Sequence, residues 1–132
     1  MVIDTSALLA IFLAEPERQQ FLEQITQAEK RFISAVNAFE TGIVLEARRG
    51  ESAGREFDLF LGRANLEVVA ADPEQVEIAR IAWRRYGKGR HPAALNLGDC
   101  FAYALAKTLG EPLLAKGLDF AQTDIDVCKN SR

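Results

Sequence analysis

Short apolar runs that alternate with longer helical segments constrain this fold more than any other feature of the sequence. The apolar runs fall at residues 2–3, 31–33, 66–70, 113–115 and 125–127, and helical apolar spacing occupies residues 6–13, 16–28, 34–49, 51–63, 73–86 and 99–109. Strands joined by helices pair in parallel through right-handed crossovers, and a sheet covered on both faces takes apolar strands. We therefore expect a three-layer α/β/α sandwich with a mainly parallel sheet of four or five strands.

Capping residues set the expected helix boundaries. Pro16 suits the first turn of a helix, Ser34 is an N-cap, and Gly50 ends the helix that Ser34 begins. Asp72 and Pro73 together predict an N-cap and first turn for the helix that ends near residue 86.

Length and composition indicate one globular domain over residues 1–132. Hydrophobic residues make up 48% of the chain, which is enough for one core. Cys100 and Cys128 form no disulfide framework, so we expect a reducing compartment. Neither a signal peptide nor an apolar run of transmembrane length is predicted, and a cytoplasmic location without membrane contact is expected.

Two acidic residues follow strands of the expected sheet. Asp4 ends the first apolar run, and Asp119 follows the fourth by a short loop. Because functional crevices of open α/β sheets lie beyond the carboxyl ends of the strands, both acids belong at one edge. Asp99 opens the helix over residues 99–109, and Glu40 lies inside the helix over 34–49. If the fold gathers these four carboxylates, their repulsion calls for a cation, and oxygen ligands suit Mg²⁺ or Mn²⁺.

Glu40 carries the strongest functional signal of the four. It shares one predicted helix face with Val36, Ile43, Val44 and Ala47. A carboxylate in an apolar stripe is costly unless it is paired or ligating. The structural alternative is an ion pair at the helix boundary, with Arg48 or Arg49.

Each remaining acid also has a structural explanation. Asp4 and Asp99 are both good helix N-caps, and Asp119 could be a surface turn residue. Asp124 and Asp126 lie close to Asp119, and the sequence leaves open which of them reaches the site, although the position after the strand favours Asp119.

The basic residues are concentrated around the segment over 84–91. This segment carries Arg84, Arg85, Lys88, Arg90 and His91, and a solvated surface explains such runs as well as phosphate contacts do. The formal net charge is −3, which does not by itself indicate nucleic-acid binding. A single histidine argues against a zinc site or a nucleophile triad.

In this order, the motifs resemble the PIN-domain family, and closely its VapC-like branch of toxin–antitoxin ribonucleases. The resemblance rests on Val2-Ile3-Asp4-Thr5-Ser6-Ala7-Leu8, on Glu40, on Leu97-Gly98-Asp99-Cys100-Phe101-Ala102-Tyr103-Ala104-Leu105-Ala106, and on the closing segment over residues 112–125. It spans nearly the whole chain. One departure is Leu118, where many relatives carry an acid, and this makes Asp119 the matching position.

The resemblance implies a PIN-like fold and an acidic metal site. Asp4, Glu40, Asp99 and Asp119 would hold one or two Mg²⁺ or Mn²⁺ ions, with Ser6 as a hydroxyl support and Asp124 near the site. RNA would be the substrate, in single-stranded or loop form. Its backbone would contact Arg84, Arg85, Lys88, Arg90 and Lys116.

The resemblance also implies a cognate antitoxin and a homodimer. Apolar residues of the helices over 16–28 and 34–63 exceed what one small core needs, among them Phe57, Leu59, Phe60 and Leu61, and some should lie at an interface. A PIN nuclease without an antitoxin is one alternative. A receiver-like signalling module is a minor one, because it needs an acid at the end of the third strand, where Asp72 is better explained as a cap.

Overall fold

The strands of this computed structural model, which describes residues 1–129, form one parallel sheet. Its strands are β1 (Val2–Ile3), β2 (Phe32–Ser34), β3 (Glu67–Val69) and β4 (Leu113–Leu114), in the spatial order β3-β2-β1-β4. Val2 is in register with Phe32 on one side and Leu113 on the other. The expected parallel sheet is confirmed.

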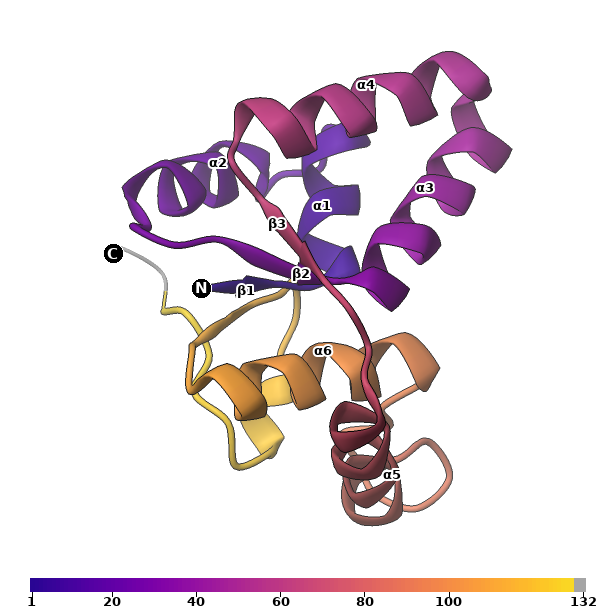
Figure 1. The fold of residues 1–132 in the computed structure, drawn as a ribbon, viewed down its shortest axis with the longest axis vertical. Coiled ribbons are helices and arrows are strands. Elements are labelled where there is room, and N and C mark those ends of the chain that lie inside the picture. The colour runs from indigo at the N-terminus through magenta and orange to yellow at the C-terminus, as the bar shows by residue number, and fades with distance from the viewer. Residues whose placement is uncertain (130–132) are drawn as a thin grey trace.

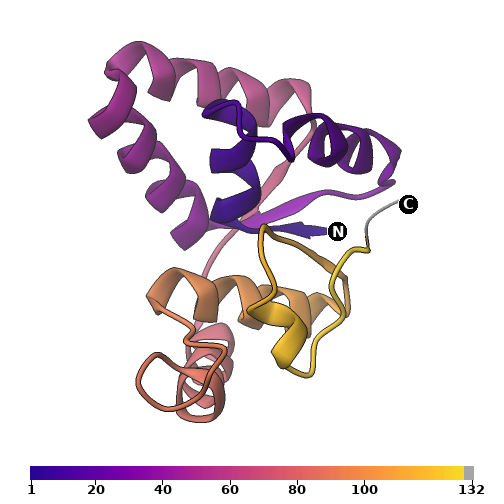
Figure 2. The same ribbon diagram turned by 180° about the vertical axis from the view of Figure 1, so that it is seen from behind.

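Helices cover both faces of the sheet (Figures 1 and 2). On one side lie α1 (Thr5–Phe12), α2 (Arg18–Gln27), α3 (Ala35–Arg49) and α4 (Glu51–Arg63). On the other lie α5 (Pro73–Tyr86) and α6 (Leu97–Leu109), together with a short 3-10 helix, η1 (Phe120–Gln122). This arrangement is the three-layer sandwich that the alternating pattern predicts.

Neighbouring strand residues serve opposite layers of the core. Val2 and Leu113 pack with α5 and α6, while Ile3 and Leu114 pack with α1 to α4. Successive side chains of a strand point to opposite faces, so two-residue strands contribute to both cores. This double burial explains why the two-residue strands β1 and β4 contain only apolar residues.

The capping residues act largely as predicted. The Ser34 side chain accepts a hydrogen bond from Val36 N, and Asp72 accepts one from Gln75 N. The structure differs from the expected starts of α2 and α6. Helix α2 begins at Arg18 rather than at Pro16, which lies in a turn.

Helix α6, in contrast, begins earlier than expected, at Leu97 rather than at Asp99. Asn96 is its N-cap, and Asp99 occupies the third helical position, where the two residues form a capping box. The Asn96 side chain accepts from Asp99 N at 2.9 Å, and Asp99 Oδ2 accepts from Asn96 N at 3.0 Å. Asn96 and Asp99 can both cap a helix, so the sequence alone does not distinguish a start at Leu97 from one at Asp99.

The sheet has less pairing at its edges than the apolar runs suggested. Residues 125–127 form no strand; Val127 makes only an isolated bridge to Leu113. At the opposite edge, β3 exposes Glu67 and Val68, so this strand is covered on one side at most. No helix in the described part of the chain is both long and apolar enough to cross a membrane.

Candidate active site

Asp4 lies at the carboxyl end of β1, where it also caps α1. Its Oδ2 accepts a hydrogen bond from Ser6 N at 3.0 Å. Its Oδ1 is buried and has no hydrogen-bond partner among residues 1–129. Only 2% of the residue is exposed. Burial raises the pKa of Asp4 from 3.8 to about 7; hydrogen bonds from Ser6 oppose the rise, and the nearby charges of Asp99 and Glu40 add to it.

Asp99 is half-buried at the first turn of α6, close to the other acids. Burial is the main cause that raises its pKa, opposed by the hydrogen bond from Asn96 N. The charges of Glu40 and Asp119 raise the pKa of Asp99 further, and Asp99 in turn raises that of Asp4. Asp99 is therefore within electrostatic range of each of the other three acids that the sequence singled out.

Glu40 reaches the site for a reason other than the one its sequence context suggested. The buried face of α3 carries Asn37, Thr41 and Leu45, whereas Ile43 is 49% exposed. The predicted apolar stripe around Glu40 is therefore wrong, because α3 turns a partly polar face inward. Glu40 is half-buried beside that face, and none of the ion pairs within residues 1–129 joins it to an arginine.

A glycine allows the Glu40 carboxylate to approach α6. A Cβ atom at Gly98 would lie 2.4 Å from Glu40 Oε1 and 2.9 Å from Oε2. Gly98 sits in the first turn of α6, where unpaired N–H groups carry the positive end of the helix dipole. The Glu40 carboxylate can therefore lie close to the backbone at the start of α6.

A buried polar network beneath the acids joins three helices, and little in the sequence indicates it. Thr5 Oγ1 donates to Glu40 Oε1 at 2.7 Å and accepts from Asn37 Nδ2 at 3.2 Å. Asn37 Nδ2 also donates to the Gly98 carbonyl at 3.0 Å. Asn37 is fully buried, so its amide fixes α1, α3 and α6 relative to one another. The available signal was a pair of polar residues, Asn37 and Thr41, four apart on one face.

Asp119 approaches from the loop after β4. It is exposed and precedes η1, where it makes no side-chain cap. Ser6 helps to hold this loop, because its Oγ accepts a hydrogen bond from Lys116 N at 2.9 Å. Ser6 therefore joins Asp4 to the loop that carries Asp119.

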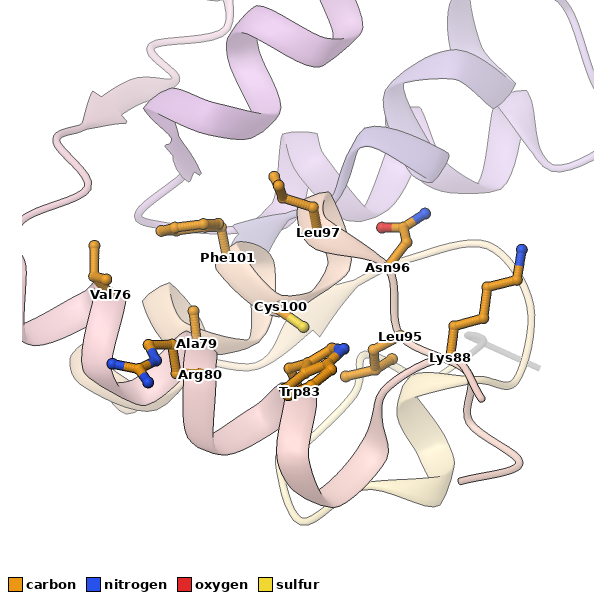
Figure 3. A pocket seen from close by; sticks show the side chains of 10 residues that line it. All are labelled: Val76, Ala79, Arg80, Trp83, Lys88, Leu95, Asn96, Leu97, Cys100 and Phe101. Atoms are coloured by element: carbon orange, nitrogen blue, oxygen red, sulfur yellow. The ribbon is translucent and has the colours of Figure 1, made fainter. Parts of the chain in front are cut away.

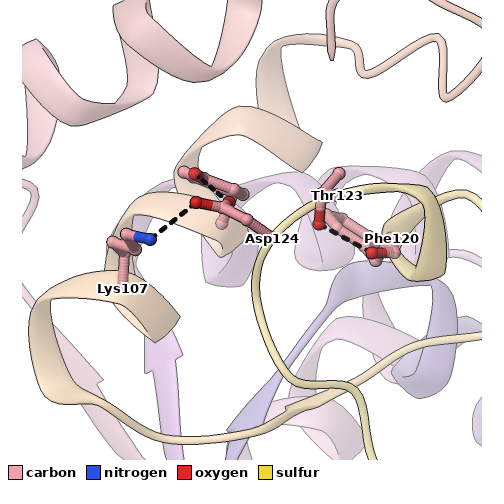
Figure 4. Close-up of polar contacts among 5 residues, drawn as sticks. Lys107, Phe120, Thr123 and Asp124 are labelled. Atoms are coloured by element: carbon pink, nitrogen blue, oxygen red, sulfur yellow. Dashed lines mark hydrogen bonds and ion pairs between the residues drawn. The ribbon is translucent and has the colours of Figure 1, made fainter. Parts of the chain in front are cut away.

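Asp124 lies apart from the four acids. It accepts hydrogen bonds from Tyr103 Oη at 2.5 Å and from Lys107 Nζ at 2.8 Å, and Figure 4 shows the second of these. These contacts lower the pKa of Asp124, with Lys107 contributing most. Lys107 lies two helical turns beyond Asp99, so Asp124 fastens the chain to the far half of α6.

The predicted basic residues come from two separate segments of the chain. Arg84 and Arg85 lie in the last turn of α5, and Lys88 and Arg90 follow in the loop. The Arg90 guanidinium lies over the Trp83 ring, 4.6 Å from its centroid. Lys116 Nζ forms ion pairs with Glu15 at 2.9 Å and with Glu17 at 3.4 Å. Both interactions raise the pKa of Lys116, and the one with Glu15 contributes more.

The donor set suits a hard divalent cation. The four side chains offer only carboxylate oxygens, and Asp4 Oδ1 is a buried acceptor without a donor. Within residues 1–129, no three His, Cys, Asp or Glu side chains already form a cage for one ion. Asp99 Oδ2 and Glu40 Oε1 are each committed to one hydrogen bond, and each carboxylate keeps a second oxygen for a ligand.

Comparison with known proteins identifies the family. The family model for the PIN domain matches residues 1–126. The chain belongs to the PIN-domain family. The chain is 53% identical over 125 residues to Ribonuclease VapC of Mycolicibacterium smegmatis, an alignment that covers 95% of this chain and 97% of the relative. It is 52% identical to Ribonuclease VapC30 of Mycobacterium tuberculosis, with 95% of each chain covered.

Solved structures of PIN proteins share the fold. VapC20 of Mycobacterium tuberculosis, described as a sarcin-ricin loop cleaving toxin, has a TM-score of 0.79 at 17% identity and covers 97% of this chain and 98% of its own. VapBC-1 of nontypeable Haemophilus influenzae has a TM-score of 0.74 at 16% identity and covers 97% of this chain and 96% of its own. The resemblance to VapC ribonucleases is confirmed, and the receiver-like alternative is wrong; Asp72 caps α5.

Proposed function

We propose that this PIN-domain protein is the endoribonuclease toxin of a toxin–antitoxin pair and that it cleaves RNA at a Mg²⁺ or Mn²⁺ site formed by Asp4, Glu40, Asp99 and Asp119. Its relatives at 52–53% identity are VapC ribonucleases. The observation that supports the metal site is Asp4 Oδ1, a buried carboxylate oxygen that no described residue satisfies, with the charges of Asp99 and Glu40 nearby.

The side chains would have different roles in the site. Asp4 and Asp99 would be the principal ligands, since burial and mutual repulsion make both costly without a cation. Glu40 and Asp119 would complete the ligand set from α3 and from the loop after β4. A bound Mg²⁺ or Mn²⁺ would supply a Lewis acid at the scissile phosphate. Thr5 and Asn37 hold Glu40 in place from below.

RNA would approach as a single strand or an unpaired loop, because a scissile phosphate must enter a crevice at the sheet edge. Arg84, Arg85, Lys88 and Arg90 would contact its backbone on the α5 side. Lys116 would contribute less, since two glutamates already neutralise it. Asp124 would support the site indirectly, through Tyr103 on α6.

An antitoxin is the proposed protein partner. Neighbours of the same fold include a toxin–antitoxin complex from Klebsiella pneumoniae, at a TM-score of 0.71, and VapBC-1 of Haemophilus influenzae. An arginine of the antitoxin could enter the acidic crevice and pair with the carboxylates in place of metal. Co-expression with such an antitoxin is therefore expected to relieve growth arrest and to block RNA cleavage in vitro.

A homodimer would use the exposed apolar residues of α3 and α4. Phe39 is 69% exposed, Ile43 49% and Leu59 55%. Phe57 is predicted from the sequence as an interface candidate, but it is 2% exposed and packs edge-on against Phe12, so it belongs to the core. Light scattering should show a dimer for the wild type, and Phe39→Ser should shift it toward the monomer if this face is the interface.

The central test of the catalytic proposal replaces one acid. Asp99→Asn keeps the acceptor for Asn96 N but removes the negative charge, so the fold should persist while RNA cleavage with Mg²⁺ or Mn²⁺ falls by at least about 100-fold. Asp58→Asn, an exposed acid on α4, is the matched control and should cleave normally. Cleavage by Asp99→Asn at a near wild-type rate would refute the assigned site.

A further inference from the structure

A groove of about 460 Å³ lies between α5 and α6 (Figure 3). Its walls are mainly apolar, and its size suits a small planar ligand. Trp83 from α5 and Leu97 and Phe101 from α6 line it. Trp83 is 47% exposed and Leu97 is 70% exposed. A cluster of exposed large apolar side chains of this kind indicates a binding surface.

Cations surround this apolar surface. Arg80 and Lys88 line the groove, and the Arg90 guanidinium lies over the Trp83 ring. None of the ion pairs found within residues 1–129 involves Arg80, Lys88 or Arg90. An occupant that satisfies both features is planar and apolar in one part and negatively charged in another. A nucleotide has this chemistry, because its base stacks on aromatic rings and its phosphate pairs with Arg and Lys.

Asn96 links the groove to the acidic site. Asn96 lines the groove and is bonded to Asp99 in both directions, through its side-chain oxygen and its backbone N–H. Cys100, the residue after Asp99, lines the groove as well. The Asn96 amide nitrogen has no acceptor among the described residues, so it can donate to a base edge.

We propose that this groove is a base-binding subsite, in which one unpaired nucleotide next to the scissile phosphate stacks against Trp83 and Phe101. The proposal rests on the proposed function in taking RNA as the substrate. Arg80 and Lys88 neutralise the phosphates that flank this nucleotide, and Asn96 contacts its base. The subsite fixes the position of the cut relative to a flanking base, whereas the acids perform the cleavage.

Trp83 is the only tryptophan in the chain and therefore reports directly on this groove. Metal-free protein in EDTA is titrated with a short single-stranded RNA of mixed sequence, so that binding is measured without cleavage. Stacking of a base should quench the tryptophan emission. In a series of the same RNA with one abasic nucleotide at successive positions, one position should lose the quenching and bind about 10- to 100-fold more weakly.

Two variants separate stacking from simple packing. Trp83→Phe keeps an aromatic face and should bind labelled RNA within a few-fold of the wild type by fluorescence anisotropy. Trp83→Leu keeps an apolar side chain without the ring and should bind about 10- to 100-fold more weakly. Circular dichroism checks that both variants are folded. Equal affinities for the two variants, or equal binding of every abasic RNA, would overturn the proposal.

Other occupants give different results in the same experiment. Quenching that depends on protein concentration in the absence of RNA would assign the groove to a second copy of the chain and overturn the proposal. Protection of Trp83 by an antitoxin alone, with no response to RNA, would do the same. Because no metal is present, loss of cleavage through a fault in the acidic site cannot imitate either outcome.

Discussion

The buried Asp4 carboxylate should make the apo protein less stable as the pH rises. The pKa of Asp4 is raised from 3.8 to about 7, so the folded state binds a proton more tightly than the unfolded chain does. The stability that this proton contributes is fully present below about pH 4 and is lost as the pH rises through about 7. The whole rise in the pKa corresponds to about 4 kcal/mol of folding stability, and about 3 kcal/mol of this stability is lost between pH 5 and pH 8.

Asp4→Asn removes this pH dependence and tests its origin. The asparagine side chain keeps an oxygen for Ser6 N, so the cap of α1 survives. Its amide nitrogen takes the place of the unpartnered Oδ1 at a cost of about 1–3 kcal/mol, which does not vary with pH. The difference in free energy of unfolding between variant and wild type should therefore shift by about 3 kcal/mol in favour of the variant from pH 5 to pH 8.

Urea unfolding in EDTA, followed by circular dichroism at several pH values, measures this difference. Asp58→Asn removes an exposed carboxylate from α4 and should follow the wild-type curve. Parallel curves for the wild type and Asp4→Asn would refute the burial argument. Mg²⁺ added above pH 7 should stabilise the wild type and leave Asp4→Asn nearly unchanged, since a cation replaces the missing proton.

Two further substitutions test how the site is held together. Gly98→Ala adds a Cβ atom 2.4 Å from Glu40 Oε1, so the carboxylate must turn away. We expect RNA cleavage to fall by about 10-fold or more. Little stability should be lost, because alanine suits a helix better than glycine. Gly62→Ala on α4, where a Cβ meets no atom within 4 Å, should cleave like the wild type, and similar rates for both variants would contradict the geometry. Asn37→Ala removes the buried amide that links Thr5 to Gly98, and should lower the free energy of unfolding by about 3 kcal/mol in urea titrations; a loss below about 1 kcal/mol would show that the amide is not needed.

Local chemistry explains which parts of the fold were predictable. Ser34, Asp72 and Gly50 act through contacts with residues a few positions away, and all three mark helix ends as expected. The competing caps Asn96 and Asp99 show the limit of this approach, because both suit the position and only the geometry of the first turn decides between them.

Prediction of the candidate site was strongest where the backbone alone determines position. Asp4 and Asp119 follow parallel strands, and the carboxyl ends of such strands share an edge whatever the packing is. Glu40 was singled out for the wrong reason, since the orientation of α3 depends on what it packs against. Asn37 shows the same effect, because a buried amide has meaning only through Thr5 and Gly98, which are distant in sequence.

The sequence by itself determined the alternation of elements, the parallel sheet and the edge at which Asp4 and Asp119 follow their strands. These follow from hydrophobic period, capping residues and the handedness of crossovers, all of which are local or topological rules. Only the tertiary structure decided which face of α3 turns inward, that Asp124 pairs with Tyr103 and Lys107, and that Trp83 borders an open groove. Such outcomes depend on side-chain packing between segments far apart in the chain, and no periodicity within one segment encodes them.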